Sequence, residues 1–276
     1  VPKATKAFQN ALATDKITVK SLDERVRRIL VAKSNCKAYG DWMEAQKPAD
    51  PNLFSSDHGP FERADANQRV SFNLIRNAAT LLETGNTSFP IKNLEQNFLH
   101  IAIGDFESAG TVKQYLDRYK EMPHHHGVDV DDREMASKDA FVVSFHQNVK
   151  NPWKRYKLEP WEQEFLKRLS ATGKPVYLLH FANPYGVLTY PNLGENVRIL
   201  LLYENDEYAQ LLAPQFLFGA RKTKGTLPVD LNQWGEVGDG EQTEELLRLK
   251  YGLPFEVGLD VGPLNRIDST VEYAIS

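Results

Sequence analysis

The chain has 276 residues, of which 41% are hydrophobic and 25% charged, and its formal net charge at pH 7 is −4. These values are ordinary for a globular protein of one large or two smaller domains, and the acidic balance argues against a basic nucleic-acid-binding surface. The single cysteine, Cys36, excludes an internal disulfide and a cysteine-rich metal site. No apolar run approaches the ~18 residues that a membrane-spanning helix needs.

Residues 1–40 predict two helices. The sequence starts with Val1-Pro2 and not with methionine, so we expect a piece of a longer protein, and the lack of an export signal carries no weight. The first helix has apolar residues at helical spacing, and Ser21 and Glu24 match a capping box for the second. Two helices alone cannot enclose a core, so their apolar faces need a partner; the faces comprise Ala4, Ala7, Phe8, Ala11 and Leu12, then Leu22, Val26, Ile29 and Leu30.

Residues 41–97 predict a linker and an entry helix. Glycines and prolines make residues 40–63 irregular. The helix that follows is expected to bury one stripe, formed by Val70, Leu74, Ala78 and Leu81.

Residues 98–231 alternate between apolar runs and amphipathic stretches. Strands are expected at 99–103, 125–130, 140–145, 176–181 and 197–202, with an edge strand at 226–229, and helices at 111–121, 160–171 and 206–218. Continuous apolar strands separated by helices predict an α/β fold, a three-layer sandwich around a mainly parallel sheet of five or six strands. Residues 232–276, rich in glycine and acids at their start, predict a linker with few contacts to the sheet.

Three stretches resemble, in order, segments of glycoside hydrolase family 3. Residues 17–33 (ITVKSLDERVRRILVAK) are similar to the last helix of that family's N-terminal barrel, and residues 70–90 (VSFNLIRNAATLLETGNTSFP) to the entry into its C-terminal domain. Residues 173–229 contain GKPVYLLHFANPY and end in LFGARKTKGTLPV, similar to the family's last strands, helix and closing signature. The resemblance implies a flavodoxin-like C-terminal domain, preceded by helices left over from a (β/α)8 barrel.

The resemblance also favours one branch of the family. β-Glucosidases usually carry G-x-x-G-G before the last helix, where this chain reads Glu204-Asn205-Asp206-Glu207. This departure looks more like the β-N-acetylglucosaminidases, in which both catalytic groups lie in the barrel. It implies that the chain holds no catalytic residue, metal or cofactor and is inactive alone. It would be the accessory domain of a bacterial, exported or periplasmic enzyme that hydrolyses β-linked N-acetylhexosamine with retention. Its partner would be the barrel, through which it would meet carbohydrate.

The end of the chain resembles a different family. Residues 251–276 contain Gly258-Leu259-Asp260, Leu264 and Ile267-Asp268. This pattern is similar to the opening of serine-hydrolase domains of the β-lactamase type, and implies the start of a second, truncated domain after residue 232.

Five residues at predicted strand ends are candidates for contact with substrate or with the barrel. Ligands of open α/β sheets gather beyond the carboxyl ends of the strands. His146, Asn183, Tyr185, Asp105 and Glu204 follow such ends. Capping of loops and packing between domains is the alternative role for these side chains.

Three other motifs suggest rival functions. Ser34-Asn35-Cys36-Lys37, with Tyr203-Glu204-Asn205 and the imperfect Lys222-Thr223-Lys224-Gly225, matches β-lactamase-class serine hydrolases, but Ser34 should end a helix and not begin one. His124-His125-His126 suggests metal, although adjacent residues of an extended segment point to opposite faces, which favours a solvated loop or edge strand. The segment 104–110 lacks the dinucleotide pattern G-x-G-x-x-G. A free-standing binding or scaffold module remains the second alternative to the glycosidase domain.

Overall fold

The computed structural model describes residues 2–14, 16–34, 60–147 and 157–259, together with 264, 267, 271, 273 and 275. The chain divides into two compact units, Val1–Glu62 and Arg63–Ser276. The predicted linker at 40–59 and the residues Cys36 and Lys37 lie outside the described residues. Among the described residues, no helix is both long and apolar enough to span a membrane.

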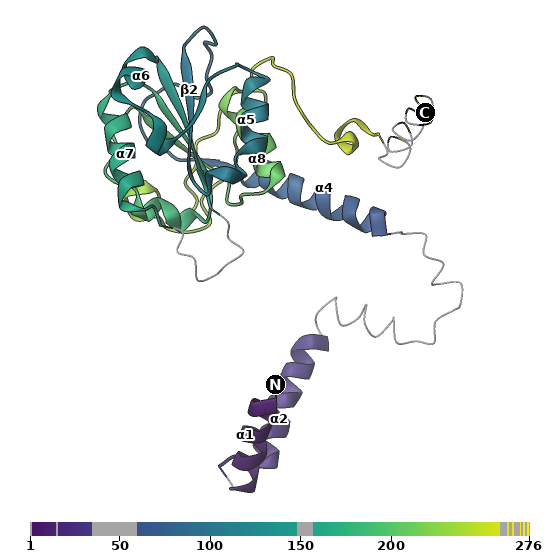
Figure 1. The fold of residues 1–276 in the computed structure, drawn as a ribbon. Helices are drawn as coiled ribbons and strands as arrows, with labels where there is room; N and C mark the ends of the chain where they lie inside the picture. The colour runs from purple at the N-terminus through teal and green to yellow at the C-terminus, as the bar shows by residue number, and fades with distance from the viewer. Residues whose placement is uncertain are drawn as a thin grey trace. The chain divides into compact units, whose positions relative to one another are not determined.

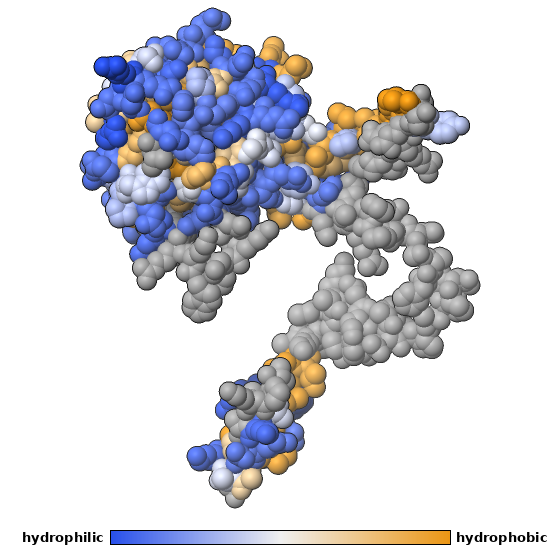
Figure 2. All heavy atoms as spheres, viewed as in Figure 1, coloured by the Kyte–Doolittle hydropathy of each residue, from blue (hydrophilic) through white to orange (hydrophobic). Residues whose placement is uncertain are grey.

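The first unit contains two helices, α1 (Pro2–Ala13) and α2 (Val19–Ser34). Helix α2 is capped by Thr18, three residues before the predicted cap Ser21, and the Thr18 hydroxyl accepts from the Ser21 N–H at 3.2 Å. The predicted apolar stripe of α2 is exposed, with Val26 at 45% and Ile29 at 56%, and hydrophobic surface is visible on this unit in Figure 2. That this face packs on a partner remains a prediction.

A six-stranded sheet forms the centre of the second unit. The strand order is β1-β6-β5-β4-β2-β3, and every neighbouring pair is parallel except β1 with β6. The prediction of a mainly parallel sheet is therefore confirmed. The strands are β1 (Thr80–Leu81), β2 (Phe98–Gly104), β3 (His124–His126), β4 (Ala140–His146), β5 (Val176–Phe181) and β6 (Val197–Leu201).

Helices cover both faces of this sheet, which gives the predicted three layers (Figure 1). One face packs against α5 (Gly110–Asp117), α8 (Glu207–Leu217) and the C-terminal half of α4 (Pro60–Ala78). The other packs against α6 (Asp132–Ser137) and α7 (Pro160–Ala171). Adjacent strand residues point to opposite faces, so Val142 joins the first core and Val143 the second, and both are fully buried. Burial on both faces explains why these strands read as unbroken apolar runs.

Three local predictions are wrong. The strand expected at 125–130 is limited to His124–His126, because residues 127–129 form the 3-10 helix η2. Helix α4 buries Phe72 and Ile75, whereas the predicted stripe residues Val70 and Leu74 are 58% and 64% exposed. Leu81, assigned to the same stripe, belongs to β1, the antiparallel edge strand that the periodicity did not predict. The expected edge strand at 226–229 is instead a loop, in which the Leu227 N–H donates to the Asp239 carbonyl at 2.7 Å.

The prediction that the tail makes few contacts is also wrong. The Glu241 N–H donates to the Leu81 carbonyl at 2.8 Å, extending the sheet edge by one antiparallel bridge. Arg248 donates to the carbonyls of Ile91 and Phe218 at 2.8 and 2.6 Å. The tail covers helix α8, whose residues from Tyr208 to Leu217 are buried all round, and a helix apolar on every side needs such a cover.

Candidate functional site

The strand order defines one position in the sheet where a ligand crevice is expected. The parallel strands lie in the order β3-β2-β4-β5-β6, which is 2-1-3-4-5 when β2 is counted as the first. The chain therefore runs from β2 to β3 on one side, and then returns to β4 on the other side of β2. In open α/β sheets, ligands bind beyond the carboxyl ends of the strands at such a switch point. Here the point lies between β2 and β4, and the two predicted residues Asp105 and His146 flank it.

The ends of β2 and β4 approach each other closely. The Asp105 N–H donates to the His146 carbonyl at 2.7 Å. Gly104 has φ +75°, and a Cβ atom there would lie 2.2 Å from the same carbonyl oxygen. Only glycine fits this position without displacing the backbone. The Gly104 N–H donates to a carboxylate oxygen of Glu162 at 2.8 Å, which fixes the start of α7 to the end of β2.

His146 is the buried polar side chain of the switch point. Its ring has no exposed surface and stacks on Phe181 of β5, with the ring centroids 4.7 Å apart. Its Nδ1 lies 2.9 Å from the amide oxygen Oδ1 of Asn205, which also accepts from the Gln210 amide at 3.0 Å. The Asn205 amide nitrogen in turn donates to the Ser108 hydroxyl at 2.9 Å. Three loops, after β2, β4 and β6, are thereby joined around one imidazole.

The hydrogen bonds define the chemistry that His146 can perform. Because Asn205 Oδ1 is an acceptor, Nδ1 of His146 carries the proton, and Nε2 presents a lone pair. Nε2 is buried and has no hydrogen-bond partner among the described residues. Burial lowers the pKa of His146 to about 4, so the ring is neutral at pH 7. Nε2 can therefore accept a hydrogen bond from a hydroxyl or amide group, but it carries no proton to donate.

The loop after β6 is shaped by an unusual backbone conformation. Tyr203 has φ +65°, which is uncommon for a residue other than glycine, and its hydroxyl lies 2.7 Å from the Thr80 hydroxyl. This turn directs Asn205 toward His146. Asp206 accepts from the Ala209 N–H at 2.7 Å and caps α8, as predicted. Glu204 lies at the surface. The part of its carboxyl group that is shielded from water, together with the charge of Asp206, raises its pKa.

Asn183 and Tyr185 form a separate turn. The Asn183 side chain accepts from the Tyr185 N–H at 3.0 Å and caps the 3-10 helix η3 (Pro184–Thr189). The Asn183 carbonyl accepts from Nε2 of His180 at 2.9 Å, and His180 lies on the opposite face of the sheet from His146. Within the described residues, these contacts give Asn183 a local capping role, while Tyr185 is 39% exposed.

Sequence reasoning missed Glu162 and Asn205. Glu162 is 3% exposed, and its two carboxylate oxygens accept from the N–H groups of Gly104 and Glu159. Burial raises the pKa of Glu162. The capping-box sequence Glu159-Pro160-Trp161-Glu162 was the available signal for it. Asn205 had no signal beyond its position after a buried strand.

Of the three histidines of β3, His124 and His126 lie on one face of the strand and His125 lies on the other, as expected for an extended segment. His124 contacts Asp117 of α5 at 2.8 Å, and His125 contacts Glu134 of α6 at 3.0 Å. His126 packs edge-on against Phe106. No group of three or more potential metal-ligating side chains is found in the part of the chain that the structure describes.

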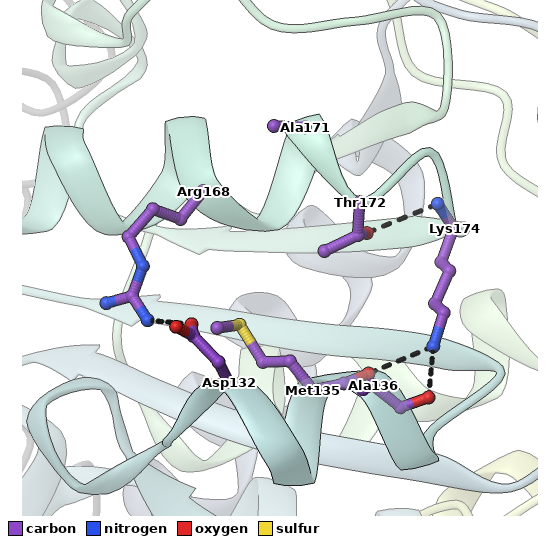
Figure 3. Close-up of a pocket in the computed structure, with 7 residues that line it drawn as sticks. All are labelled: Asp132, Met135, Ala136, Arg168, Ala171, Thr172 and Lys174. Atoms are coloured by element: carbon purple, nitrogen blue, oxygen red, sulfur yellow. Dashed lines mark hydrogen bonds and ion pairs between the residues drawn. The ribbon is translucent and has the colours of Figure 1, made fainter.

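Two surface hollows lie away from the switch point, and internal bonds engage their charged groups. The hollow of Figure 3, about 460 Å³ between α6 and α7, lies near the amino ends of the strands. There Arg168 pairs with Asp132 at 2.6 Å, and the Lys174 ammonium donates to the Met135 and Ala136 carbonyls at the end of α6. The second hollow, about 580 Å³, has the charged residues Arg76, Arg221, Lys250 and Glu256 in its lining. The Glu256 carboxylate binds both arginines, at 3.0 and 2.7 Å.

The fold belongs to the flavodoxin-like class of α/β sandwiches, defined by the strand order and the two helical layers. Among solved structures, the chain is similar to a beta-glucoside phosphorylase, BglX, in complex with 2FGlc, with a TM-score of 0.58 and 19% identity over 82% of this chain and 41% of that one. It is also similar to a fungal multi-domain GH3 beta-N-acetylglucosaminidase, with a TM-score of 0.53 and 15% identity over 84% of this chain and 26% of that one. At sequence identities of 15% and 19%, this structural similarity establishes a shared fold and nothing further.

The chain therefore spans less than half the length of the proteins that it resembles in structure. The likeness is to a part of each of these larger proteins, one of which is described as a GH3 beta-N-acetylglucosaminidase. No protein-family profile and no curated protein sequence matches the chain.

Proposed function

We propose that this chain is the C-terminal α/β domain of a retaining family 3 glycoside hydrolase, and that it supports a (β/α)8 barrel which carries the catalytic groups. The observation that carries the proposal is a coincidence of two independent signals. The three sequence stretches occur in the family's order, and the folded unit that contains most of them has the fold of a part of such proteins. The amino-acid composition alone predicts neither the order of these stretches nor the fold.

The β6–α8 loop supports an accessory role for this domain. A retaining glycosidase usually needs two carboxyl groups ~5–5.5 Å apart, one of them a nucleophile. In this loop Asp206 is engaged in capping α8, and also accepts from the Ser71 hydroxyl at 3.2 Å. Asn205 is held against His146, and Glu204 points to the surface side of the turn. The loop is thus organised by structural bonds.

The choice of substrate follows from the same loop. Without the G-x-x-G-G pattern, residues 204–207 resemble the branch that acts on β-linked N-acetylglucosamine, and the fungal neighbour is described as a beta-N-acetylglucosaminidase. We propose N-acetylhexosamine in glycans or cell-wall fragments as the substrate of the whole enzyme. Asp105, Asn183, Tyr185 and Glu204 are at least partly exposed beyond the strand ends, and together with the buried His146 they are the candidates for contact with the barrel or the sugar. A bacterial, exported parent is the context we propose.

An activity comparison tests this proposal. The 276-residue chain and the product of the complete reading frame are assayed with p-nitrophenyl β-N-acetylglucosaminide, β-glucoside and β-xyloside. We expect no turnover by the chain, and turnover of the N-acetylglucosaminide by the complete product. Preference for the glucoside would contradict the branch but not the family. A complete product without any barrel segment would contradict the whole proposal and favour a free-standing binding module.

A serine hydrolase is the less supported alternative. Tyr203 of its Y-x-N motif has its hydroxyl on Thr80, and Ser34 is the last residue of α2. Covalent labelling of Ser34 by a β-lactam would be the observation in its favour.

A further inference from the structure

The second hollow, here called the tail hollow, receives positive side chains from three separate segments of the chain. Arg76 lies on α4, Arg221 follows α8, and Lys250 belongs to the tail. One acidic side chain, Glu256, shares this lining of about 580 Å³. The rest of the lining is backbone and apolar side chain, from tail residues 252–254 and 257. The lining therefore carries more positive than negative charge.

Buried contacts hold Arg221 in one position. Its Nε donates to the side-chain oxygen of Gln215 at 2.9 Å, and Gln215 has no exposed surface. Its Nη2 donates to the Glu256 carboxylate at 2.7 Å. The guanidinium carbon also lies 5.5 Å from the ring centroid of Phe72, which is fully buried. Because these contacts already fix the side chain, an anion bound to it would cost little additional side-chain entropy.

Arg76 presents a second guanidinium group to the same carboxylate. Its Nη1 donates to Glu256 at 3.0 Å, and its guanidinium carbon lies 6.0 Å from the centroid of the Phe72 ring. One carboxylate therefore faces two cations. The Arg76 side chain is 35% exposed, so part of its guanidinium group is open to solvent in the tail hollow.

The cations of the tail hollow retain the capacity to bind a further anion. Within the described residues, Arg221 donates to Gln215 and Glu256, and Arg76 donates to Glu256 alone. A guanidinium group carries more N–H donors than these contacts use, and its planar fork matches the oxygens of a carboxylate or a phosphate. Lys250 adds charge at the rim, where it is 46% exposed and its partner is a surface acid outside the lining, Glu245.

Gly252 leaves space beside the two arginines. A Cβ atom at this position would lie 2.0 Å from a carboxylate oxygen of Glu256 and 3.2 Å from Nη2 of Arg221. A larger residue would therefore push the carboxylate out of its place between the arginines. Next to the glycine, Leu253 and Val257 form an apolar wall of the tail hollow, and Val257 is 73% exposed.

We propose that the tail hollow is a binding site for a small organic anion. A carboxylate or phosphate group of this ligand binds to Arg76 and Arg221, and its apolar part packs on the apolar wall. The site is separate from the switch point, and it does not depend on the proposed glycosidase function. Because the ligand contacts α4, the loop after α8 and the tail together, its binding also stabilises the docked tail.

Nuclear magnetic resonance of the whole 276-residue chain, at low ionic strength, tests the proposal with hexanoate, acetate and hexyl phosphate as probes. We expect hexanoate to cause saturable shifts at the arginine Nε–H groups of Arg76 and Arg221 and at the amides of Gly252 and Leu253. Acetate, which lacks the apolar part, should bind about tenfold more weakly. The tighter of hexanoate and hexyl phosphate identifies the anionic group. Shifts that do not saturate, or equal affinities for acetate and hexanoate, would indicate an adventitious ion only and overturn the proposal.

Three variants locate the site. Arg76→Gln leaves the more buried pair of Arg221 and Glu256 in place, and should weaken hexanoate binding at least about tenfold through the loss of charge-assisted bonds. Lys250→Gln, at the exposed rim, should weaken it at most about fivefold. Lys92→Gln is the control, because Lys92 pairs with a surface acid outside the tail hollow, and it should leave the affinity unchanged.

A thermal shift gives a second readout of the same site. Hexanoate should raise the Tm of the original chain and of Lys92→Gln, but not that of Arg76→Gln. Melting curves without ligand establish that each variant is folded. Equal affinity and equal thermal shift in Arg76→Gln and Lys92→Gln would show that the anion binds elsewhere.

Discussion

The substitution Glu256→Gln tests whether the tail is part of the folded domain. The Glu256 side chain is 13% exposed and binds Arg221, which is 11% exposed, at 2.7 Å, and Arg76, which is 35% exposed, at 3.0 Å. Breaking a buried ion pair by removing one partner costs ~3–5 kcal/mol, because the other charge stays buried. The more exposed Arg76 bond adds little. Since glutamine retains one acceptor oxygen, we expect a loss of about 3 kcal/mol, which corresponds to a fall in Tm of about 6–12 °C for a domain of this size.

Glu244→Gln is the matched control in the same tail. Its partner is Lys92, and both side chains are more than half exposed, so the loss should stay below about 1 kcal/mol. Urea unfolding of both variants, followed by far-ultraviolet circular dichroism, gives the two free energies. Equal losses in the two variants, or none in either, would refute the reasoning that the tail is clamped to the sheet domain by a buried charge.

Three further outcomes follow from the site. Burial lowers the pKa values of His146 and His180 from 6.5 to about 4 in the folded chain. The unfolded chain therefore binds more protons between pH 6.5 and 4, so the free energy of unfolding should decrease as the pH is lowered. The expected decrease is about 2 kcal/mol per histidine at pH 5 relative to pH 7.5. Urea midpoints at the two pH values measure this fall, and His146→Asn should remove that residue's share. Gly104→Ala should cost at least ~2 kcal/mol more than Gly173→Ala, because both have positive φ but only Gly104 meets a backbone oxygen; equal costs would contradict the close approach. Asn205→Asp should raise the pKa of His146 in a proton titration, and an unchanged value would mean that Asn205 does not face the ring.

The sheet was predictable because its strands are buried on both faces. The expected strands at 176–181 and 140–145 agree with β5 and β4 to within one residue. The two-residue strand β1 was not predictable, because Thr80 and Leu81 are too short a segment to show a period of two. The face of α4 was misjudged because the helix carries two apolar stripes. The buried one contains Phe72, which packs edge-on against Tyr208 of α8 and Phe255 of the tail.

The packing of the tail could have been predicted from the sequence of helix α8. Helix α8 is apolar on every side and contains the buried Gln215, whose amide donates to the Tyr251 carbonyl at 2.6 Å. The sheet covers only one side of such a helix, so some other segment had to cover the rest. Glycines and acids in the tail indicated a linker, but its aromatic residues, Tyr251 and Phe255, were the relevant ones.

The site was predictable in part. The rule that ligands gather beyond strand ends selected Asp105 and His146, which the switch point joins. It did not select Asn205, because a side chain that reaches from the β6 loop to β4 depends on the turn at Tyr203, whose positive φ has no signature in a non-glycine residue. Contacts between loops after different strands are set by tertiary structure, and a single sequence carries little information about them.

Covalent trapping tests the central claim most directly. A fluorinated N-acetylglucosaminyl fluoride that accumulates the glycosyl-enzyme intermediate of a retaining glycosidase is reacted with the product of the complete reading frame, and the labelled peptide is identified by mass spectrometry. We expect a label on a carboxylate of the barrel and none on residues 1–276. A label within residues 1–276, on Asp105 or Glu204 above all, would contradict the accessory role.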